Sequence, residues 1–264
     1  MSKLSARPRS LIASENVKGR LLAHFVLTLR NHVGVLQGVS SLTSKHQVNI
    51  LSGYHEIPAG SDALWSFFAD MTDADVSADQ LSSEYAQLPS VLDVKFRASS
   101  FGFIADFFNF PVTLNTHPLL MVTVDSMMTV FRHMREMLGE KVACVVIHQM
   151  GVSSGEAIYR AFEARFGRQA SREELEEFLH LVRCTGWGWE TLTELHMETS
   201  TAKVTFAGSV ECLFFSGSSQ PQSQFVRGTY SGFFSGLFGK TVEADEVRCV
   251  AKGDSICEFL LKPR

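Results

Sequence analysis

The stretch Phe225-Val-Arg-Gly-Thr-Tyr-Ser-Gly-Phe-Phe-Ser-Gly-Leu-Phe-Gly239 places the strongest constraint on the fold. On a helix, its phenylalanines and leucine share one face, while Gly228, Gly232 and Gly236 form a row on another. A row of residues without side chains lets a second backbone approach closely. We therefore predict a helix that packs tightly against another element.

The segments around this helix alternate between predicted helices and strands. Residues 125–138 have the apolar spacing of an amphipathic helix, which Gly139 ends. Another helix spans residues 171–184 and opens with a capping box, Ser171-Arg-Glu-Glu174. Gly151, Gly155, Gly186 and Gly188 are interpreted as turn and packing glycines. The predicted strands are 191–198, 203–206 and 209–215, followed by a hairpin of 241–251 with 255–261.

The earlier part of the chain predicts a smaller α+β unit. Strand patterns at residues 24–29, 47–51, 63–69 and 91–96 are interleaved with helical patterns at 35–42 and 77–88. The order β-α-β-β-α-β is that of a ferredoxin-like domain. We therefore predict an α+β protein in three parts: a flexible tail over residues 1–19, a ferredoxin-like domain over 20–98 and a second domain over 99–264.

The composition and the motifs of the chain argue against several classes of function. The chain has 264 residues, of which 45% are hydrophobic and 20% charged, and its net charge of −4 gives no basic footprint for direct nucleic-acid binding. No apolar run is long enough to span a bilayer, and the five cysteines, an odd number, favour a cytoplasmic protein. Neither a catalytic constellation nor a phosphate-binding or dinucleotide motif occurs, so we expect a non-enzyme without a nucleotide cofactor.

The first domain resembles the ACT family of amino-acid-sensing domains. The resemblance rests on Leu27-Thr-Leu-Arg-Asn-His-Val-Gly-Val-Leu36 and on Gln47-Val-Asn-Ile50. It implies a small-ligand site at the turn into the first helix, formed by Asn31, His32, Val33 and Gly34, although many such domains only dimerise. His32-Val33 departs from the charged residue and proline that the family usually has there.

The second domain resembles the 4-vinyl-reductase-type (4VR) family. The motifs that carry this resemblance, in order, are Leu138-Gly139, Met150-Gly-Val-Ser-Ser-Gly155, Gly186-Trp-Gly188, Gly208-Ser-Val-Glu211, the residues 227–239 quoted above, Glu246-Val-Arg-Cys249 and Gly253-Asp-Ser-Ile-Cys257. The resemblance implies helices packed on an antiparallel sheet. Pairing with an ACT-like domain is the layout of certain archaeal proteins. Other members are the sensor domains of aromatic-responsive activators and vesicle-tethering subunits of the TRAPP type.

The resemblance also implies a zinc site. Aromatic-sensing members use a glutamate and two cysteines at the spacing of Glu246, Cys249 and Cys257, plus an upstream cysteine whose position here is occupied by Ser223. The set is therefore one ligand short, and Cys212 or a water molecule are the candidates to complete it, although Cys212 falls on a different predicted strand. The alternatives are that Cys249 and Cys257 are small buried side chains paired across a hairpin, or form a disulfide.

Members of the family enclose an apolar small molecule between helices and sheet. The candidate lining residues here are Phe107, Phe110, Phe131, Trp187, Phe225, Tyr230, Phe233 and Phe234, joined by Phe108 and Met127. The alternative, which periodicity does not separate from a pocket and which is favoured at most single positions, is that they fill a solid core. We expect a dimeric ligand-sensing regulator that binds a small aromatic or hydrophobic molecule and acts through a protein partner. The alternatives are a TRAPP-like structural adaptor and, less favoured, a vinyl reductase.

Overall fold

The chain divides into two compact units, Met1–Leu120 and Met121–Arg264. The computed structural model describes residues 13–58, 61–114, 117–168 and 171–264. The boundary falls later than the predicted one at residue 98, because β6 (Phe103–Ala105) pairs with β1 (Ser14–Asn16) inside the first unit. Residues 1–12 of the predicted tail lie outside the described residues. For Ser14–Asn16 the prediction of a flexible tail is wrong, since these residues form a strand.

The first unit has the predicted ferredoxin-like arrangement. Its sheet has the antiparallel order β3-β4-β2-β5, and the central pair is β2 and β4. The elements are β2 (Leu22–Leu29), α1 (Val35–Lys45), β3 (Asn49–Glu56), β4 (Ala63–Asp70), α2 (Ala78–Ala86) and β5 (Val91–Ser99), and short strands β7 (Thr113–Leu114) and β8 (His117–Pro118) follow. Ser77 caps α2 with the two reciprocal bonds of a capping box. Buried Val39, Leu81 and Tyr85 pack the helices against the sheet.

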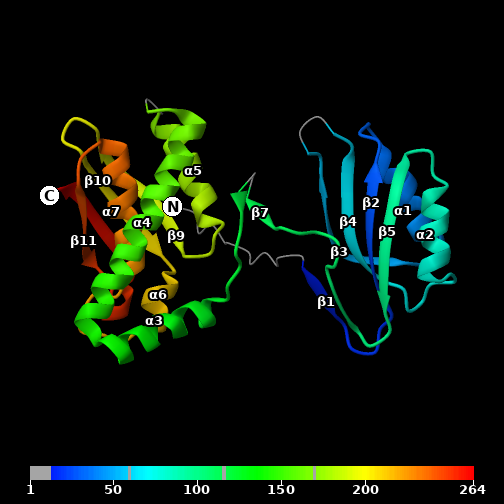
Figure 1. Ribbon diagram of the computed structural model, residues 1–264, viewed down its shortest axis with the longest axis horizontal. Coiled ribbons are helices and arrows are strands. Elements are labelled where there is room, and N and C mark those ends of the chain that lie inside the picture. Colours follow the sequence, from blue (N-terminus) through cyan, green and yellow to red (C-terminus); the bar gives the residue numbers. More distant parts are fainter. Residues whose placement is uncertain (1–12, 59–60, 115–116, 169–170) are drawn as a thin grey trace. The chain divides into compact units, whose positions relative to one another are not determined.

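The second unit is built on a four-stranded antiparallel sheet of order β11-β12-β10-β9 (Figure 1). Its elements are α3 (Val124–Leu138), α4 (Glu140–Phe166), α5 (Arg172–Arg183), β9 (Trp189–His196), β10 (Thr201–Ala207), α6 (Val210–Phe214), α7 (Gln224–Phe238), β11 (Val242–Arg248), the 3-10 turn η1 (Val250–Lys252) and β12 (Cys257–Pro263). α7 packs on β11 and β12, and α4 packs on α7. The predicted final hairpin and the capping box that opens α5 are both present.

The prediction of a strand at residues 209–215 is wrong, because this segment folds as α6. Gly208 adopts a left-handed backbone (φ 65°), which ends β10. Ser209 then caps the new helix by accepting a hydrogen bond from the N–H of Cys212. The turn buries Glu211 and Cys212 completely, whereas alternation along a strand would have left one of them exposed.

The predicted close approach of the glycine-rich helix is confirmed, and its partner is α4. A Cβ on Gly228 or Gly232 of α7 would collide with the carbonyl oxygens of His148 and Val152 in α4. In return, a Cβ on Gly151 or Gly155 would collide with the backbone of α7. The expectation that Gly151 and Gly155 form turns is therefore wrong: they lie inside one continuous helix and act only as packing residues.

The main core of the second unit lies between α7 and the sheet. Phe234 and Phe259 are fully buried there, and Phe162 and Phe178 extend the aromatic packing to α4 and α5. Among the described residues, no helix is both long and apolar enough to cross a bilayer.

The helix contact gives a direct test. Gly232→Ala should lower the free energy of unfolding by roughly 1–3 kcal/mol, because the added methyl must displace the backbone of α4. Gly38→Ala in α1 is the matched control: a Cβ there meets no atom within 4 Å, so the gain in helix propensity should stabilise by up to about 1 kcal/mol. Urea unfolding followed by circular dichroism measures both. Equal effects of the two substitutions would contradict the close packing.

Candidate metal centre and adjoining cavity

Four side chains meet in the second unit with the composition of a metal site. One ligand atom each from Cys212, Glu246, Cys249 and Cys257 can be chosen so that all four lie within 4.8 Å of one another. The three cysteines are fully buried, and Glu246 is partly buried. The structure thus brings together the three residues predicted from the sequence and adds Cys212 as the fourth.

The four residues come from different parts of the second unit. Cys212 lies on α6, Glu246 near the end of β11, Cys249 at the residue before η1, and Cys257 at the start of β12. Asp254 holds the loop between the strands by accepting a hydrogen bond from the N–H of Cys249 at 2.8 Å. A group that joined these four atoms would therefore fasten α6 to the β11–β12 hairpin.

The spacing of the atoms is that of a tetrahedral zinc ligand set. The Sγ of Cys212 lies 3.5 Å from the Sγ of Cys249 and 3.5 Å from the Sγ of Cys257. It lies 3.8 Å from Oε1 of Glu246. With Zn–S bonds of about 2.3 Å, two tetrahedral sulfur ligands stand about 3.8 Å apart. The residues present therefore fit Zn²⁺ with little rearrangement.

Ser223 lies beside the four residues and binds two of them. Its hydroxyl donates to Oε1 of Glu246 at 2.8 Å, and its backbone N–H donates to Oε2 at 3.2 Å. The same hydroxyl lies 2.9 Å from the Sγ of Cys212. Ser223 thus orients the carboxylate and one thiol from the position that the family resemblance assigns to a ligand.

The short distances between the cysteine thiols and the Glu246 carboxyl change the pKa values of these groups. Hydrogen bonds from Cys249 and Cys257 lower the pKa of the Cys212 thiol to about 3, and the contact with Cys212 raises the pKa of Cys257. Burial raises the pKa of the Glu246 carboxyl to about 7. A divalent cation would let further ligands ionise.

Glu211 has a structural role, although it lies in the segment 209–215 that the sequence predicts as a strand. It is fully buried, and its carboxylate accepts hydrogen bonds from the N–H groups of Phe225 and Val226 at the start of α7. Burial raises its pKa to about 8, while those backbone bonds act in the opposite direction. Glu211 therefore caps α7 from a neighbouring helix, a contact across 14 residues that no local capping pattern reveals.

The predicted pocket-lining residues separate into three groups. Phe131, Trp187 and Phe225 form a small aromatic cluster, in which the Trp187 and Phe225 rings stack with centroids 4.4 Å apart. Met127 packs against this cluster, while Tyr230, Phe233 and Phe234 belong to the main core. Phe107 and Phe110, in contrast, lie in the first unit and are 72% and 95% exposed. Phe108 also lies there, beside buried His24.

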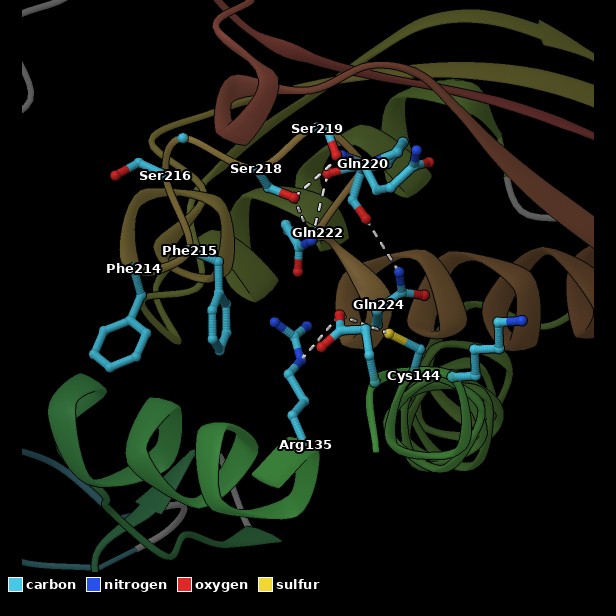
Figure 2. A pocket seen from close by; sticks show the side chains of 14 residues that line it. Arg135, Cys144, Phe214, Phe215, Ser216, Ser218, Ser219, Gln220, Gln222 and Gln224 are labelled. Carbon is cyan, nitrogen blue, oxygen red and sulfur yellow. Dashed lines mark hydrogen bonds and ion pairs between the residues drawn. The ribbon is translucent and has the colours of Figure 1, made fainter. Parts of the chain in front are cut away.

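A cavity of about 700 Å³ is lined in part by Phe214 and Phe215, which also pack against the small aromatic cluster. Figure 2 shows the side chains that line this cavity. Its wall includes Arg135 of α3, Glu140 and Cys144 of α4, Phe214 of α6, and Phe215 and Gln222 from the segment that joins α6 to α7. None of the predicted lining residues is among its walls. The wall segment carries Cys212 at one end and Ser223 at the other, so the cavity and the metal cluster share a piece of chain.

The predicted ligand turn of the first unit is an exposed connection between β2 and α1. Asn31, His32, Val33 and Gly34 are all exposed there, and Val33 is entirely solvent-accessible. Gly34 has a left-handed backbone (φ 86°) and precedes α1 without a side-chain cap. The turn is therefore accessible to solvent, and its ligand binding stays a prediction.

Comparison with known proteins confirms the recognition of the 4VR domain. Residues 203–263 match the family model of this domain. The phenol-responsive sensory domain of the transcription activator PoxR, solved with phenol, aligns with 18% identity over 60% of this chain and 84% of that one, with a TM-score of 0.53. At this identity the likeness establishes the fold. No curated protein matches the chain by sequence.

Two further solved structures align at lower TM-scores. A vinyl-4-reductase family protein from Methanocaldococcus jannaschii aligns at 15% identity, over 54% of this chain and 96% of that one, with a TM-score of 0.32. A trafficking protein particle complex subunit 3 from Naegleria fowleri, covalently bound to palmitic acid, aligns at 13% identity, over 53% and 95% of the two chains, with a TM-score of 0.39.

The capping role of Glu211 can be tested by substitution. Glu211→Ala should lower the free energy of unfolding by roughly 1–3 kcal/mol, because the buried N–H groups of Phe225 and Val226 lose their acceptor. Glu136→Ala, on the exposed side of α3, should change it by less than about 0.5 kcal/mol. Thermal unfolding by calorimetry distinguishes the two. A neutral Glu211→Ala would show that α7 does not depend on this cap.

Proposed function

We propose that this protein is a non-catalytic ligand-sensing regulator, in which a zinc-braced 4VR domain binds a small, largely apolar molecule. The observation that carries the proposal is the shared segment: residues between Cys212 and Ser223 join the metal cluster to the wall of the cavity. A molecule that enters the cavity would contact the same piece of chain that the metal holds in place. Ligand binding and the arrangement of α6 and α7 would thereby be linked.

Zinc would serve as a structural cross-link. Three thiolates and one carboxylate complete a tetrahedral set, so the ion has no open position for water or substrate, as in structural rather than catalytic sites. Cys212, Cys249, Cys257 and Glu246 would hold the ion, with Ser223 orienting the carboxylate through its hydroxyl. This closed donor set also supports the proposal that the domain is not an enzyme.

The cavity supports the sensing role. It is open to solvent and most of its lining residues are polar or charged, while Phe214 and Phe215 form an aromatic side. Its volume of about 700 Å³ lies within the range of small-molecule sites. The PoxR sensory domain, which shares the fold, is described as phenol-responsive. By analogy with that fold, we propose an aromatic or otherwise hydrophobic ligand for this chain. The ferredoxin-like unit would then pass the signal on by forming a homodimer in the cytoplasm and contacting a protein partner.

A structural adaptor is the second candidate. The observation in its favour is an exposed apolar face on α3 and α4, where Val130, Met137, Val142 and Val145 are all more than half exposed. Apolar patches of this kind often mark protein–protein contacts. An adaptor would need this face but not the cavity, so ligand binding separates the two candidates.

The metal proposal predicts close to one zinc per chain in protein purified without chelator. Cys212→Ser should lower the zinc content severalfold, because one of three thiolates is lost. Cys184→Ser, at an exposed cysteine away from the cluster, should leave the content unchanged. Elemental analysis by mass spectrometry supplies the measurement.

Ser223→Ala distinguishes a metal site that includes Cys212 from one that uses position 223, which the family spacing implies. It should keep near-stoichiometric zinc, because Ser223 orients a ligand without being one. Retention of zinc in Cys212→Ser together with its loss in Ser223→Ala would reverse the assignment. A protein that binds no zinc at all would remove the proposed brace.

The sensing proposal predicts stabilisation by small aromatic compounds. A ligand at about 100 times its Kd adds about 2.7 kcal/mol of stability, which corresponds to a rise of roughly 5–10 °C in Tm. Cys144→Phe should abolish the rise by filling the cavity, whereas Val145→Phe, at the next and 69% exposed position of α4, should retain it. If no compound raises Tm in the unmodified protein, the adaptor becomes the better description.

A further inference from the structure

Arg135 is a charged residue of the cavity wall that is largely buried and makes no hydrogen bond within the described structure. It projects from α3 into the cavity, between Phe215 and Cys144 (Figure 2). Its side chain is only 9% exposed. Nε and Nη2 of its guanidinium are both buried without a hydrogen-bond partner. A buried guanidinium with unmade bonds is rare, since each such donor has lost its water.

The position of the guanidinium is fixed by stacking. Its central carbon lies 3.8 Å from the centroid of the Phe215 ring, close enough for a cation–π contact. A guanidinium whose flat face packs on a ring still has its N–H donors free along its edge, where they can pair with an acceptor in the same plane. Stacking thus holds the group without using its hydrogen bonds.

No carboxylate in the described ranges of the chain completes those bonds. The nearest, Glu140, has Oε1 3.8 Å from Nε of Arg135, an ion pair too long for a hydrogen bond. The carboxylate of Glu211 also attracts Arg135 electrostatically, but it already accepts hydrogen bonds from the N–H groups of Phe225 and Val226. The guanidinium is therefore attracted to nearby negative charge without being bound by it.

The charge of the cavity wall favours a single negative charge on a ligand. Arg135 and Lys141 contribute two positive charges and Glu140 one negative, which gives +2 − 1 = +1. Burial raises the pKa of the Cys144 thiol, the remaining titratable group of the wall, so it stays neutral. A monoanion would balance this charge, whereas a doubly charged phosphate would leave an excess.

A second unsatisfied group faces the same region. Oε1 of Gln222 is buried without a hydrogen-bond partner, while its amide nitrogen donates to Ser218 at 2.7 Å. The wall therefore offers both an unused donor, on Arg135, and an unused acceptor. Phe214 and Phe215 supply the apolar surface next to them.

We propose that the cavity binds small aromatic or apolar carboxylates, with the carboxylate paired to the edge of the Arg135 guanidinium. The apolar body of the ligand would lie against Phe214 and Phe215, and a hydroxyl or amino group on it could donate to Gln222. This inference rests on the proposed sensing function and narrows its ligand class to monoanions. A ligand carboxylate would satisfy the buried donors and add the negative charge that the wall lacks.

Benzoate is the probe, and benzyl alcohol is its neutral counterpart of similar shape. Isothermal titration and saturation-transfer NMR on the full chain should show that benzoate binds at least tenfold more tightly than benzyl alcohol. Arg135→Gln should weaken benzoate binding at least tenfold and leave benzyl alcohol within about twofold, consistent with the loss of a charge-assisted pair. Phenyl phosphate, which carries two negative charges, should bind more weakly than benzoate.

Arg132→Gln is the matched control. Arg132 lies one helical turn earlier on α3, is exposed, and also lies over a phenylalanine ring, that of Phe214, but does not contribute to the cavity wall. It should leave benzoate binding within twofold of the unmodified protein. Arg135→Lys keeps the positive charge but loses the planar guanidinium, so it should reduce benzoate affinity by less than Arg135→Gln does. It also provides a second test if Arg135→Gln does not fold.

The outcomes separate this inference from the sensing proposal. Tight binding of benzyl alcohol with no preference for benzoate, or benzoate binding unaffected by Arg135→Gln, would overturn the carboxylate assignment and leave a sensor of neutral molecules. A preference for phenyl phosphate would reassign the cavity to phosphorylated ligands. If neither benzoate nor the neutral aromatic compounds bind, the carboxylate inference and the sensing proposal fail together.

Discussion

The architecture of the second unit depends on the direct backbone contact between α4 and α7. Gly151 and Gly155 on one helix and Gly228 and Gly232 on the other leave no room for a Cβ, so the two helices meet without intervening side chains. Their approach frees the opposite face of α7 to pack its phenylalanines on the sheet. With α7 fixed in this way, its amino terminus and the loop before it have a defined place over the β11–β12 hairpin.

That amino terminus is where the rest of the candidate site is assembled. Glu211 satisfies the first N–H groups of α7, and Ser223 ties the same end to Glu246. These contacts bring Cys212 to the thiols of the hairpin, although it is distant from them in sequence. Residues of the same segment also line the cavity. Helix packing, cap, metal cluster and cavity wall are thus successive consequences of one close contact.

Much of this arrangement could be predicted from the sequence, because periodicity and glycine placement are local signals. The β-α-β-β-α-β order, the glycine-rich helix and the final hairpin followed from them. The sequence left Cys212 as one of two candidates for the fourth ligand and did not reveal the cap formed by Glu211, because both roles depend on contacts across long stretches of chain. The apolar content of α6 also resembles that of a strand. Arg135 carries no sequence signal at all: an arginine on an amphipathic helix is ordinarily exposed, and only the packing of Phe215 shows that this one is not.

The five residues of α6 combine roles that most proteins distribute over separate segments. Glu211 caps a helix, Cys212 reaches the metal cluster, and Phe214 forms part of the cavity wall. Such a concentration limits how this segment can evolve. An insertion or deletion of a single residue would rotate all three side chains by about 100° around the helix axis, so their functions would be lost together. Relatives that use a different ligand set would need a compensating change elsewhere before this turn could be altered.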